Sequence, residues 1–450
     1  MAQRIRWSKL LQPLLSLWLC KFFATHAFVN IHDDPSTAPS QDQHEQDFFP
    51  PLIDSDDISY FFSTYDLDGL HWALTNIFQR SSRHPTTTTK RKPLPDILVA
   101  RGGGEAYTSE YKLRHDLEQA RYLVQVLTEE HDATLVEYLK SHVIPIYEQV
   151  LTRIPPLSEL GPTKGLYAFT RDDYDAGIAT VYNKALYFTS ADELHPGWRE
   201  ESVGLLNSRL DWEAVQRKWF GEKNTEKKVD SSSSMAMSSD GVIVIDNLLN
   251  QQALDIIRKL LLRNTHWYQT KTPLQFGKYV GAYIDDGLHD PIFLELAKAL
   301  HQTLPRIMKG HDLRYMWAYK YDSEWSSGIN LHADQAAVNV NIWLSLGANL
   351  DEKSGGLVVF TAKPPESWDF ESYNTNTDMV VEELLRPTNF ANITVPHRPN
   401  RAVIFDSTLF HQTDKYTFKQ GYENGRINLT FLFGKMSKGT ENDVAHSEEL

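Results

Sequence analysis

The second half of the chain contains several short segments that are rich in β-branched and aromatic residues and bounded by Gly, Asn, Asp or Pro. They are "RYMWAYKYD" (314–322), "AAVNVNIWLSL" (336–346), "GGLVVFT" (355–361), "NRAVIFDS" (400–407) and "RINLTFLFG" (426–434). Such segments are typical of β-strands closed by turns. Because helical patterns precede these strands and do not alternate with them, the sequence predicts an α+β fold whose core is a β-sandwich or barrel.

Helical patterns fill the region between residues 105 and 222. Apolar residues recur at steps of four, three, four and three, the spacing of one helix face, at Leu113, Leu117, Ala120, Val124 and Leu127. A similar pattern follows over residues 131–151, where Pro145 predicts a kink or a boundary. The sequence therefore predicts a mainly helical accessory domain over residues 105–222.

A further strand and two helices are expected just before the strand-rich region. "GVIVIDNLL" (241–249) has the β-branched composition of a strand, and Asn250 is a suitable N-cap for the helix that follows. A second helix is expected from Pro291. We therefore place one α+β domain over residues 241–437.

Composition divides the remainder of the chain. Residues 29–104 are expected to be mostly linker or disordered, apart from a short helical element around residues 66–78. Residues 223–240 form a Ser-rich linker, and residues 438–450 form a polar tail.

The first 28 residues are typical of a secretory signal peptide, with basic residues followed by an apolar stretch from Leu10 to Leu19 and then by small residues. Lys21 interrupts the apolar run, which favours a cleaved signal over a membrane span. We therefore expect the secretory pathway or the extracellular space. The alternative is an uncleaved anchor that holds the protein on the lumenal side of a membrane.

Charge and cysteine content exclude some classes of function. The formal net charge of −14 argues against a nucleic-acid partner, which requires a basic surface. Cys20 is the only cysteine, so the chain after it can form no disulfide and no cysteine-ligated zinc site. The cores must therefore be held by packing alone, and 41% hydrophobic residues provide enough apolar surface for this.

A histidine and an aspartate stand two positions apart in "LHADQAAVNVNIWL" (331–344), where a polar loop enters an apolar strand. In an extended segment, His332 and Asp334 lie on the same face. His411 in "DSTLFHQT" follows another strong strand and is the candidate for a third ligand. Two histidines and one carboxylate on one side of a metal suit non-haem Fe(II), which must keep open positions for a cosubstrate and oxygen.

A lone His-x-Asp is most often a surface pair, so a metal site needs further support. Arg426 alternates with apolar residues in "GRINLTFLFG" (425–434), and its guanidinium therefore shares a strand face with Asn428 and Thr430. A mostly buried arginine requires an anion. In addition, "SGGLVVF" (354–360) places two glycines at the start of a strand between the ligand segments, where they allow a tight turn.

In this order, the His-x-Asp, the Gly-Gly strand, "NRAVIFDSTLFHQT" (400–413) and "RINLTF" (426–431) resemble the Fe(II)/2-oxoglutarate-dependent dioxygenase superfamily, whose core is a double-stranded β-helix, or jelly roll. The stretch "GVIVIDNLLNQQALDIIRKLL" (241–261) is similar to the strand and helix that precede such cores. From about residue 113 to 435 the chain also resembles a poorly characterised group of these oxygenases, some of them bacterial and with tetratricopeptide segments. The motifs of that similarity are "WAYKYDS", "HADQAAVNVNIWL", "SGGLVVF", "WDFESYN" and "GYENGRINLTFLFG".

The resemblance implies that His332, Asp334 and His411 are the catalytic Fe(II) ligands. It also implies that Arg426 pairs with the distal carboxylate of 2-oxoglutarate through a bidentate fork, with assistance from Asn428. By the same resemblance, O2 would be the second cosubstrate and succinate a product. Whether ascorbate is a further cofactor stays open.

Several assignments stay open at the level of sequence. Tyr319 or Tyr321 would match a cosubstrate-binding tyrosine of related enzymes, although a core aromatic is the simpler explanation for either. Asn341 contacts substrate or cosubstrate only if its strand face, shared with Asn339 and Trp343, points inward. Three residues are alternatives to the assignments above: Lys415 and Lys419 for the anion, and His397 for the third metal ligand.

We therefore expect an oxygenase that hydroxylates or otherwise oxidises an unidentified protein, peptide or small molecule. The helical domain slightly favours a protein or peptide substrate, by analogy of architecture. One alternative is an inactive jelly-roll binding or scaffold protein. The other is a cupin-like metalloenzyme that uses no keto acid.

A glycan map of secreted protein tests the expected compartment. The sequon at Asn392 lies in a loop-like stretch and is an expected acceptor, whereas the sequon at Asn428 should stay empty because its strand is packed in the core. A glycan at Asn428 contradicts the strand assignment. Full-length protein that remains unglycosylated in the cytosol contradicts the signal peptide.

Overall fold

The computed structural model describes residues 54–81, 107–163, 165–199, 204–222, 235–239, 241–324, 326–365, 367–368 and 370–436. The expected signal segment and the polar tail lie outside the described residues, as does most of the Ser-rich linker. In the described part of the chain, we find no helix with the length and apolar character that a membrane span requires.

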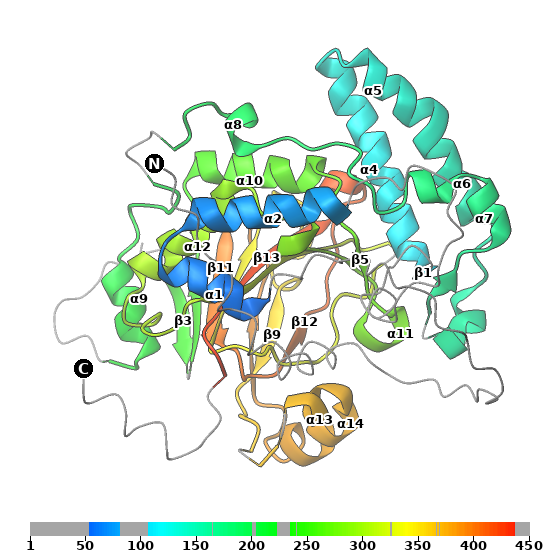
Figure 1. Cartoon of the computed structure of the whole chain (residues 1–450). Helices are drawn as coiled ribbons and strands as arrows, with labels where there is room; N and C mark the ends of the chain where they lie inside the picture. Colours follow the sequence, from blue (N-terminus) through cyan, green and yellow to red (C-terminus); the bar gives the residue numbers. More distant parts are fainter. Residues whose placement is uncertain are drawn as a thin grey trace, which may run out of the picture.

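An antiparallel sheet of eight strands has the order β3-β4-β11-β8-β13-β7-β6-β5. It lies at the centre of the fold (Figure 1). The strands are β3 (Met235–Ser239), β4 (Val242–Ile245), β5 (Gln269–Thr270), β6 (Val280–Tyr283), β7 (Leu313–Tyr321), β8 (Val338–Trp343), β11 (Arg401–Asp406) and β13 (Arg426–Phe433). The expected mixed α and β architecture is therefore confirmed, and each of the five strands read from the second half of the chain is present, four in this sheet and one in a second sheet.

A second antiparallel sheet has the order β10-β9-β12 and is built from β9 (Leu357–Phe360), β10 (Asn392–Val395) and β12 (His411–Thr413). From β8 onward the chain moves to the small sheet for β9 and β10, back to the large sheet for β11, to the small sheet for β12 and back again for β13. Apolar side chains of both sheets, among them Trp343, Val359, Val395 and Phe405, form one buried cluster. The two sheets therefore share a core.

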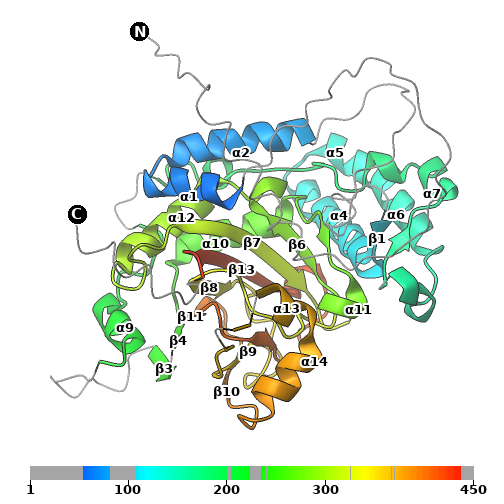
Figure 2. The same ribbon diagram turned by 60° about the horizontal axis from the view of Figure 1, so that its bottom comes forward.

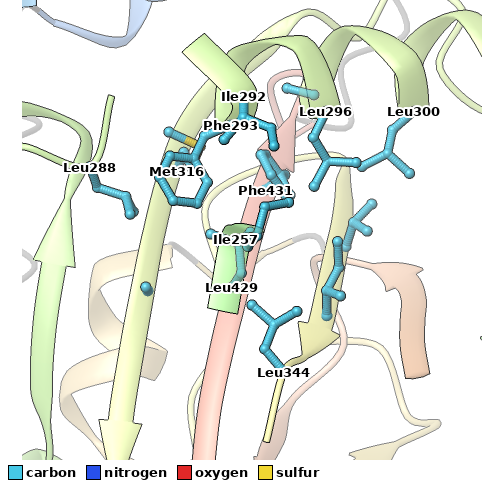
Figure 3. Close-up of a cluster of buried hydrophobic side chains, with 14 of the residues drawn as sticks. Ile257, Leu288, Ile292, Phe293, Leu296, Leu300, Met316, Leu344, Leu429 and Phe431 are labelled. Atoms are coloured by element: carbon cyan, nitrogen blue, oxygen red, sulfur yellow. The ribbon is translucent and has the colours of Figure 1, made fainter. Parts of the chain in front are cut away.

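Helices α10 (Gln251–Arg263) and α12 (Pro291–Thr303) cover the other face of the large sheet. Figure 3 shows Ile257 of α10 and Leu296 of α12 in the same apolar cluster as Leu429 and Phe431 of β13. Asn250 caps α10, because its side chain accepts a hydrogen bond from the Ala253 amide, as the sequence predicted. Both faces of the central strands are thus buried.

The described residues between Tyr107 and Glu222 are mainly helical. It contains β1 (Tyr107–Thr108), α4 (Glu110–Glu129), α5 (Ala133–Tyr138), η2 (Leu139–Val143), α6 (Ile144–Leu151), η3 (Leu157–Thr163), β2 (Tyr167–Ala168), α7 (Arg171–Asp175), η4 (Ile178–Thr180), α8 (Ala191–Leu194) and α9 (Trp212–Trp219). Helices α4 to α6 bury an apolar cluster of their own that includes Leu113, Leu123 and Val143. Pro145 stands in the first turn of α6, at the boundary predicted for it.

Two helices lie within residues 29–104, where mostly linker was expected. They are α1 (Ser55–Ser63) and α2 (Leu67–Ser81), and the second contains the expected short helical element. Ile58, Phe62 and Leu70 are buried in the main core. Short amphipathic helices of this kind gain most of their stability from packing, and the partner surface is not visible in their own sequence.

A helical insertion joins β9 to β10 and comprises α13 (Phe370–Thr375), α14 (Thr377–Met379) and η6 (Val380–Leu385). Figure 2 shows α13 and α14 beside the strands of the small sheet. The remaining short elements are α11 (Pro273–Phe276), η5 (Ile284–Asp286) and η7 (Tyr422–Asn424). Asn392 lies at the start of strand β10 and not in the expected loop, but it is exposed. Asn428 is buried in β13, as the glycosylation prediction requires.

We expect α1 to contribute to global stability. Replacing Phe62, which is 0% exposed, by alanine should lower the free energy of unfolding by about 3–5 kcal/mol, because it leaves a cavity against the main core. Tyr60 on the same helix is 67% exposed, so Tyr60→Ala should change the free energy of unfolding by about 0.5 kcal/mol or less. Urea denaturation followed by circular dichroism measures both, and equal midpoints would contradict the docking of α1.

Candidate metal centre

Backbone hydrogen bonds bring the three predicted ligands together. The His332 N–H donates to the His411 carbonyl at 3.1 Å, and the His411 N–H donates to the His332 carbonyl at 2.8 Å. This isolated antiparallel bridge continues the edge of the small sheet beyond β12. The Asp334 N–H donates to the Ser407 carbonyl at 3.1 Å, which fixes the third ligand beside the other two.

The ligand atoms of His332, Asp334 and His411 all lie within 4.8 Å of one another. His332 Nε2 is 3.8 Å from Asp334 Oδ1, and His411 Nε2 is 3.5 Å from Asp334 Oδ2. One ion can therefore reach two imidazole nitrogens and a carboxylate from one side. Among the described residues, this is the group of histidine, cysteine and acidic side chains that could hold a metal.

The hydrogen bonds of both imidazoles leave Nε2 available for a metal. His332 Nδ1 donates to the Asn330 carbonyl at 2.7 Å, and His411 Nδ1 donates to the Leu409 carbonyl at 3.0 Å. A ring that donates through Nδ1 to a carbonyl carries its lone pair on Nε2 when it is neutral. Burial holds the pKa of His411 well below its ordinary value, so this ring is neutral at physiological pH.

Asp334 is embedded in a chain of side-chain amides. Burial raises the pKa of this carboxyl group, while His332 and a hydrogen bond from Asn339 Nδ2 at 2.5 Å oppose the rise. Asn341 Nδ2 donates to Asn339 Oδ1, and Asn428 Nδ2 and Thr430 Oγ1 both donate to Asn341 Oδ1. The chain orients the carboxylate in the manner of outer-shell partners in metal sites. Asn339 shares a strand face with Asn341, as the sequence predicted, but its contact with Asp334 was not predicted.

Arg426 is 1% exposed and lies on the same inner face of the large sheet. Its guanidinium stacks on the rings of Tyr321 and Trp343, 4.9 Å and 5.1 Å from their centroids. It donates to the Gly356 carbonyl at 3.3 Å, and its Nε has no hydrogen-bond partner among the described residues. Burial lowers its pKa to about 9. Within the described residues no carboxylate pairs with this cation, so the site is suited to an external anion.

One pocket collects most of the predicted site residues. It is lined by His332, Asp334, His411, Arg426, Asn428, Asn341 and Tyr319, together with Trp317, Ile329, Leu357, Thr413 and Thr430, which were not predicted as site residues. The face of β8 that carries Asn341 therefore points inward. A signal for Thr430 was present in the alternation of β13, whereas Ile329 and Leu357 come from segments without a polar pattern.

The structure separates the two candidate tyrosines. Tyr319 lines the pocket, and its hydroxyl lies 2.9 Å from that of Tyr283, which accepts a hydrogen bond from Lys271 Nζ at 2.6 Å. Tyr321 does not line the pocket, and its hydroxyl is 3.3 Å from Thr413 Oγ1. Burial raises the pKa of Tyr319, so its hydroxyl stays protonated. Tyr319 can thus act on a ligand directly, whereas Tyr321 supports Arg426.

The alternative residues lie elsewhere. Lys415 and Lys419 are exposed and do not line the pocket. His397 is buried behind the site, where its ring stacks on Trp343 with centroids 5.3 Å apart, and it is not part of the metal-ligand group. Arg426 and His411, and not these alternatives, lie in the pocket with His332 and Asp334.

No family model matches this sequence, and no curated protein matches it. Solved structures that match this chain include a prolyl-4-hydroxylase from Pseudomonas putida, with 14% identity, a TM-score of 0.29, and coverage of 44% of this chain and 94% of that chain. A second match is HygX from Streptomyces hygroscopicus with nickel and 2-oxoglutarate bound, with 14% identity and a TM-score of 0.30. The match covers 44% of this chain and 84% of HygX. A third match is the α-ketoglutarate-dependent epimerase SnoN, with 12% identity and a TM-score of 0.32. The match covers 52% of this chain and 88% of SnoN. At these scores the similarity carries no functional argument, and the function has to be inferred from the geometry of the site.

Removing any ligand should abolish tight metal binding. In His332→Ala, Asp334→Ala and His411→Ala we expect Co(II) affinity to fall by more than the roughly 10–100-fold that is typical of losing an outer-shell partner. Asp334→Glu should also weaken binding, because it moves the carboxylate by about one methylene. Absorption titration of metal-free protein measures the affinities.

The matched control for these variants is His142→Ala. His142 is a partly exposed histidine on η2, outside the metal-ligand group, and its replacement should leave the titration unchanged. Wild-type affinity in all three ligand variants would show that no metal binds at this centre.

Proposed function

We propose that this protein is an Fe(II)- and 2-oxoglutarate-dependent oxygenase with a double-stranded β-helix core. The observation that carries the proposal is Arg426, a buried arginine without a carboxylate partner among the described residues, which lines the same pocket as the metal ligands. A cation at that depth needs an anion, and the described residues supply none. A dicarboxylate that reaches both the metal and Arg426 satisfies this need.

The strand order supports the proposed core. A jelly roll consists of two facing antiparallel sheets between which the chain passes repeatedly. Strands β7 to β13 alternate between the large and the small sheet in this way, with the His332 segment paired to β12 at the edge of the small sheet. The proposed fold therefore positions the metal ligands at the mouth of the sandwich.

The donor set fits Fe(II), since two imidazole nitrogens and a carboxylate on one side leave positions for further ligands. His332, Asp334 and His411 would hold the ion, which with 2-oxoglutarate and O2 supplies oxidation of a substrate coupled to decarboxylation of the keto acid to succinate. The backbone bridge and the amide chain hold the ligands in place, so that little reorganisation is needed on binding.

The other pocket residues would bind and orient the cosubstrate. Arg426 offers a planar fork to a carboxylate, and Tyr321 and Trp343 keep that fork in one plane. Tyr319 can donate its hydroxyl proton as a second hydrogen bond to the cosubstrate, while Lys271 holds Tyr283 beside it. The apolar side chains of Ile329 and Leu357 exclude water from part of the wall.

The alternatives lack a comparable observation. An inactive scaffold has no use for a buried, unpaired arginine, which destabilises the fold unless an anion is bound. A cupin-like metalloenzyme without a keto acid accounts for the histidines and the aspartate but not for Arg426. We further propose that the substrate is a protein, peptide or small molecule encountered in the secretory pathway or outside the cell.

The direct test is turnover of the cosubstrate. Purified full-length protein with Fe(II), ascorbate and 2-oxoglutarate should release succinate, and the release should depend on all three metal ligands. Proteins from the same secretory compartment, screened by mass spectrometry for a gain of one oxygen atom, then identify the substrate. Oxygen uptake that does not require 2-oxoglutarate would instead support the cupin-like alternative.

Arg426→Ala should separate cosubstrate binding from metal binding. We expect Co(II) to bind normally while 2-oxoglutarate binding weakens by roughly 2–5 kcal/mol, because a desolvated carboxylate loses its charged partner. Arg426→Lys should recover part of the loss, since a point charge cannot reproduce the fork. Isothermal titration of the Co(II)-loaded protein with 2-oxoglutarate measures the effect.

The control variants are Lys415→Ala and Lys419→Ala, which remove exposed cations outside the pocket and should bind 2-oxoglutarate normally. Loss of binding in either of them, with normal binding in Arg426→Ala, would transfer the anion site away from Arg426.

A further inference from the structure

Helix α13 of the β9–β10 insertion contacts the backbone between two of the metal ligands. Asn374 Oδ1 accepts a hydrogen bond from the Ala333 N–H at 2.8 Å, and Asn374 Nδ2 donates to the Ala333 carbonyl at 3.0 Å. Ala333 is the residue between His332 and Asp334. One side chain therefore satisfies both polar groups of the residue that links the two ligands.

The neighbouring residue on α13 reaches the third ligand segment. The ring of Tyr373 packs edge-on against Phe410, with centroids 5.2 Å apart, and Phe410 directly precedes His411. Ala333, Tyr373 and Phe410 belong to one buried cluster with the apolar side chains of η6. The insertion thus contacts both segments that carry the ligands.

These contacts matter because the ligand segments have little regular structure of their own. His332 takes part in an isolated bridge, and β12 begins at His411 and is three residues long. A two-point amide contact restrains the peptide plane at Ala333, and with it the directions in which the His332 and Asp334 side chains leave the backbone. Partners of this kind, outside the ligands themselves, typically alter metal affinity by about 10–100-fold when they are lost.

We propose that Asn374 is a positioning residue of the metal centre and that the β9–β10 insertion sets the affinity of the centre through it. The inference rests on the proposed metal-dependent function, and it assigns a role to the "WDFESYN" segment that neither the ligand triad nor the anion site explains. Both hydrogen bonds of the Asn374 side chain are made to the Ala333 backbone, so Asn374 acts on the ligands through that backbone.

The test is a Co(II) titration of metal-free, full-length protein. Asn374→Ala should bind Co(II) about 10–100-fold more weakly than wild type and change the visible absorption of the bound ion, because the ligand angles are no longer restrained. Asn374→Asp keeps the volume and the acceptor for the Ala333 N–H but loses the donor to its carbonyl. Its affinity should lie between those of wild type and Asn374→Ala.

The matched control is Asn376→Ala, two positions along the same insertion. Asn376 is exposed and caps α14 by accepting from the Met379 N–H, so its loss perturbs the insertion without touching Ala333. It should bind Co(II) like wild type. The thermal unfolding of each metal-free variant separates a change in Co(II) affinity from a failure to fold. If Asn374→Ala does not fold, Asn374→Asp is the variant that tests the positioning role.

The outcomes distinguish the inference from the proposed function. Wild-type affinity in folded Asn374→Ala or Asn374→Asp overturns the positioning role while leaving the metal centre intact. An equal loss in Asn376→Ala also overturns it, because the effect then comes from general loosening of the insertion. If wild-type protein binds no Co(II), or binds it as well when His332 is alanine, the metal-dependent function itself is wrong.

Discussion

The antiparallel bridge between His332 and His411 is the interaction on which the site depends. These residues lie far apart in the chain, and two backbone hydrogen bonds join them directly. Each ring then uses Nδ1 for a nearby carbonyl, so both Nε2 atoms face Asp334. Because the bridge is made by the backbone, the ligand positions follow from strand pairing and not from side-chain flexibility.

The interior between the sheets is unusual in having a polar side. Buried amides and hydroxyls are costly unless they are hydrogen-bonded, and Asn339, Asn341 and Thr430 meet this requirement within one continuous chain of bonds that ends on Asp334. Arg426 does not meet this requirement, since its Nε has no partner in the part of the chain that the structure describes. The same face therefore carries a stable polar network and one cation, Arg426, whose hydrogen bonds an external anion can complete.

The two faces of the large sheet have different roles, since one packs the apolar core and the other carries the candidate site. Helices α1, α10 and α12 pack against the outer face, where the side chains are apolar, while the inner face carries the pocket. A strand such as β13 serves both roles, because Leu429 and Phe431 alternate with Asn428 and Thr430. Elements packed on one side thus hold the register that aligns the groups on the other.

The sequence by itself predicted the long helices α4, α10 and α12, the strands β4, β7, β8, β9, β11 and β13, and the candidate metal ligands, because periodicity, the Asn250 cap and the alternation around Arg426 are properties of single segments. Only the tertiary structure decided that Tyr319 and not Tyr321 lines the pocket, that Asn341 faces inward and that Asn374 holds Ala333. It also decided that α1 and α2 dock on the core. These features depend on register and packing between segments distant in the chain, and no local pattern of side chains encodes which distant surface a residue will meet.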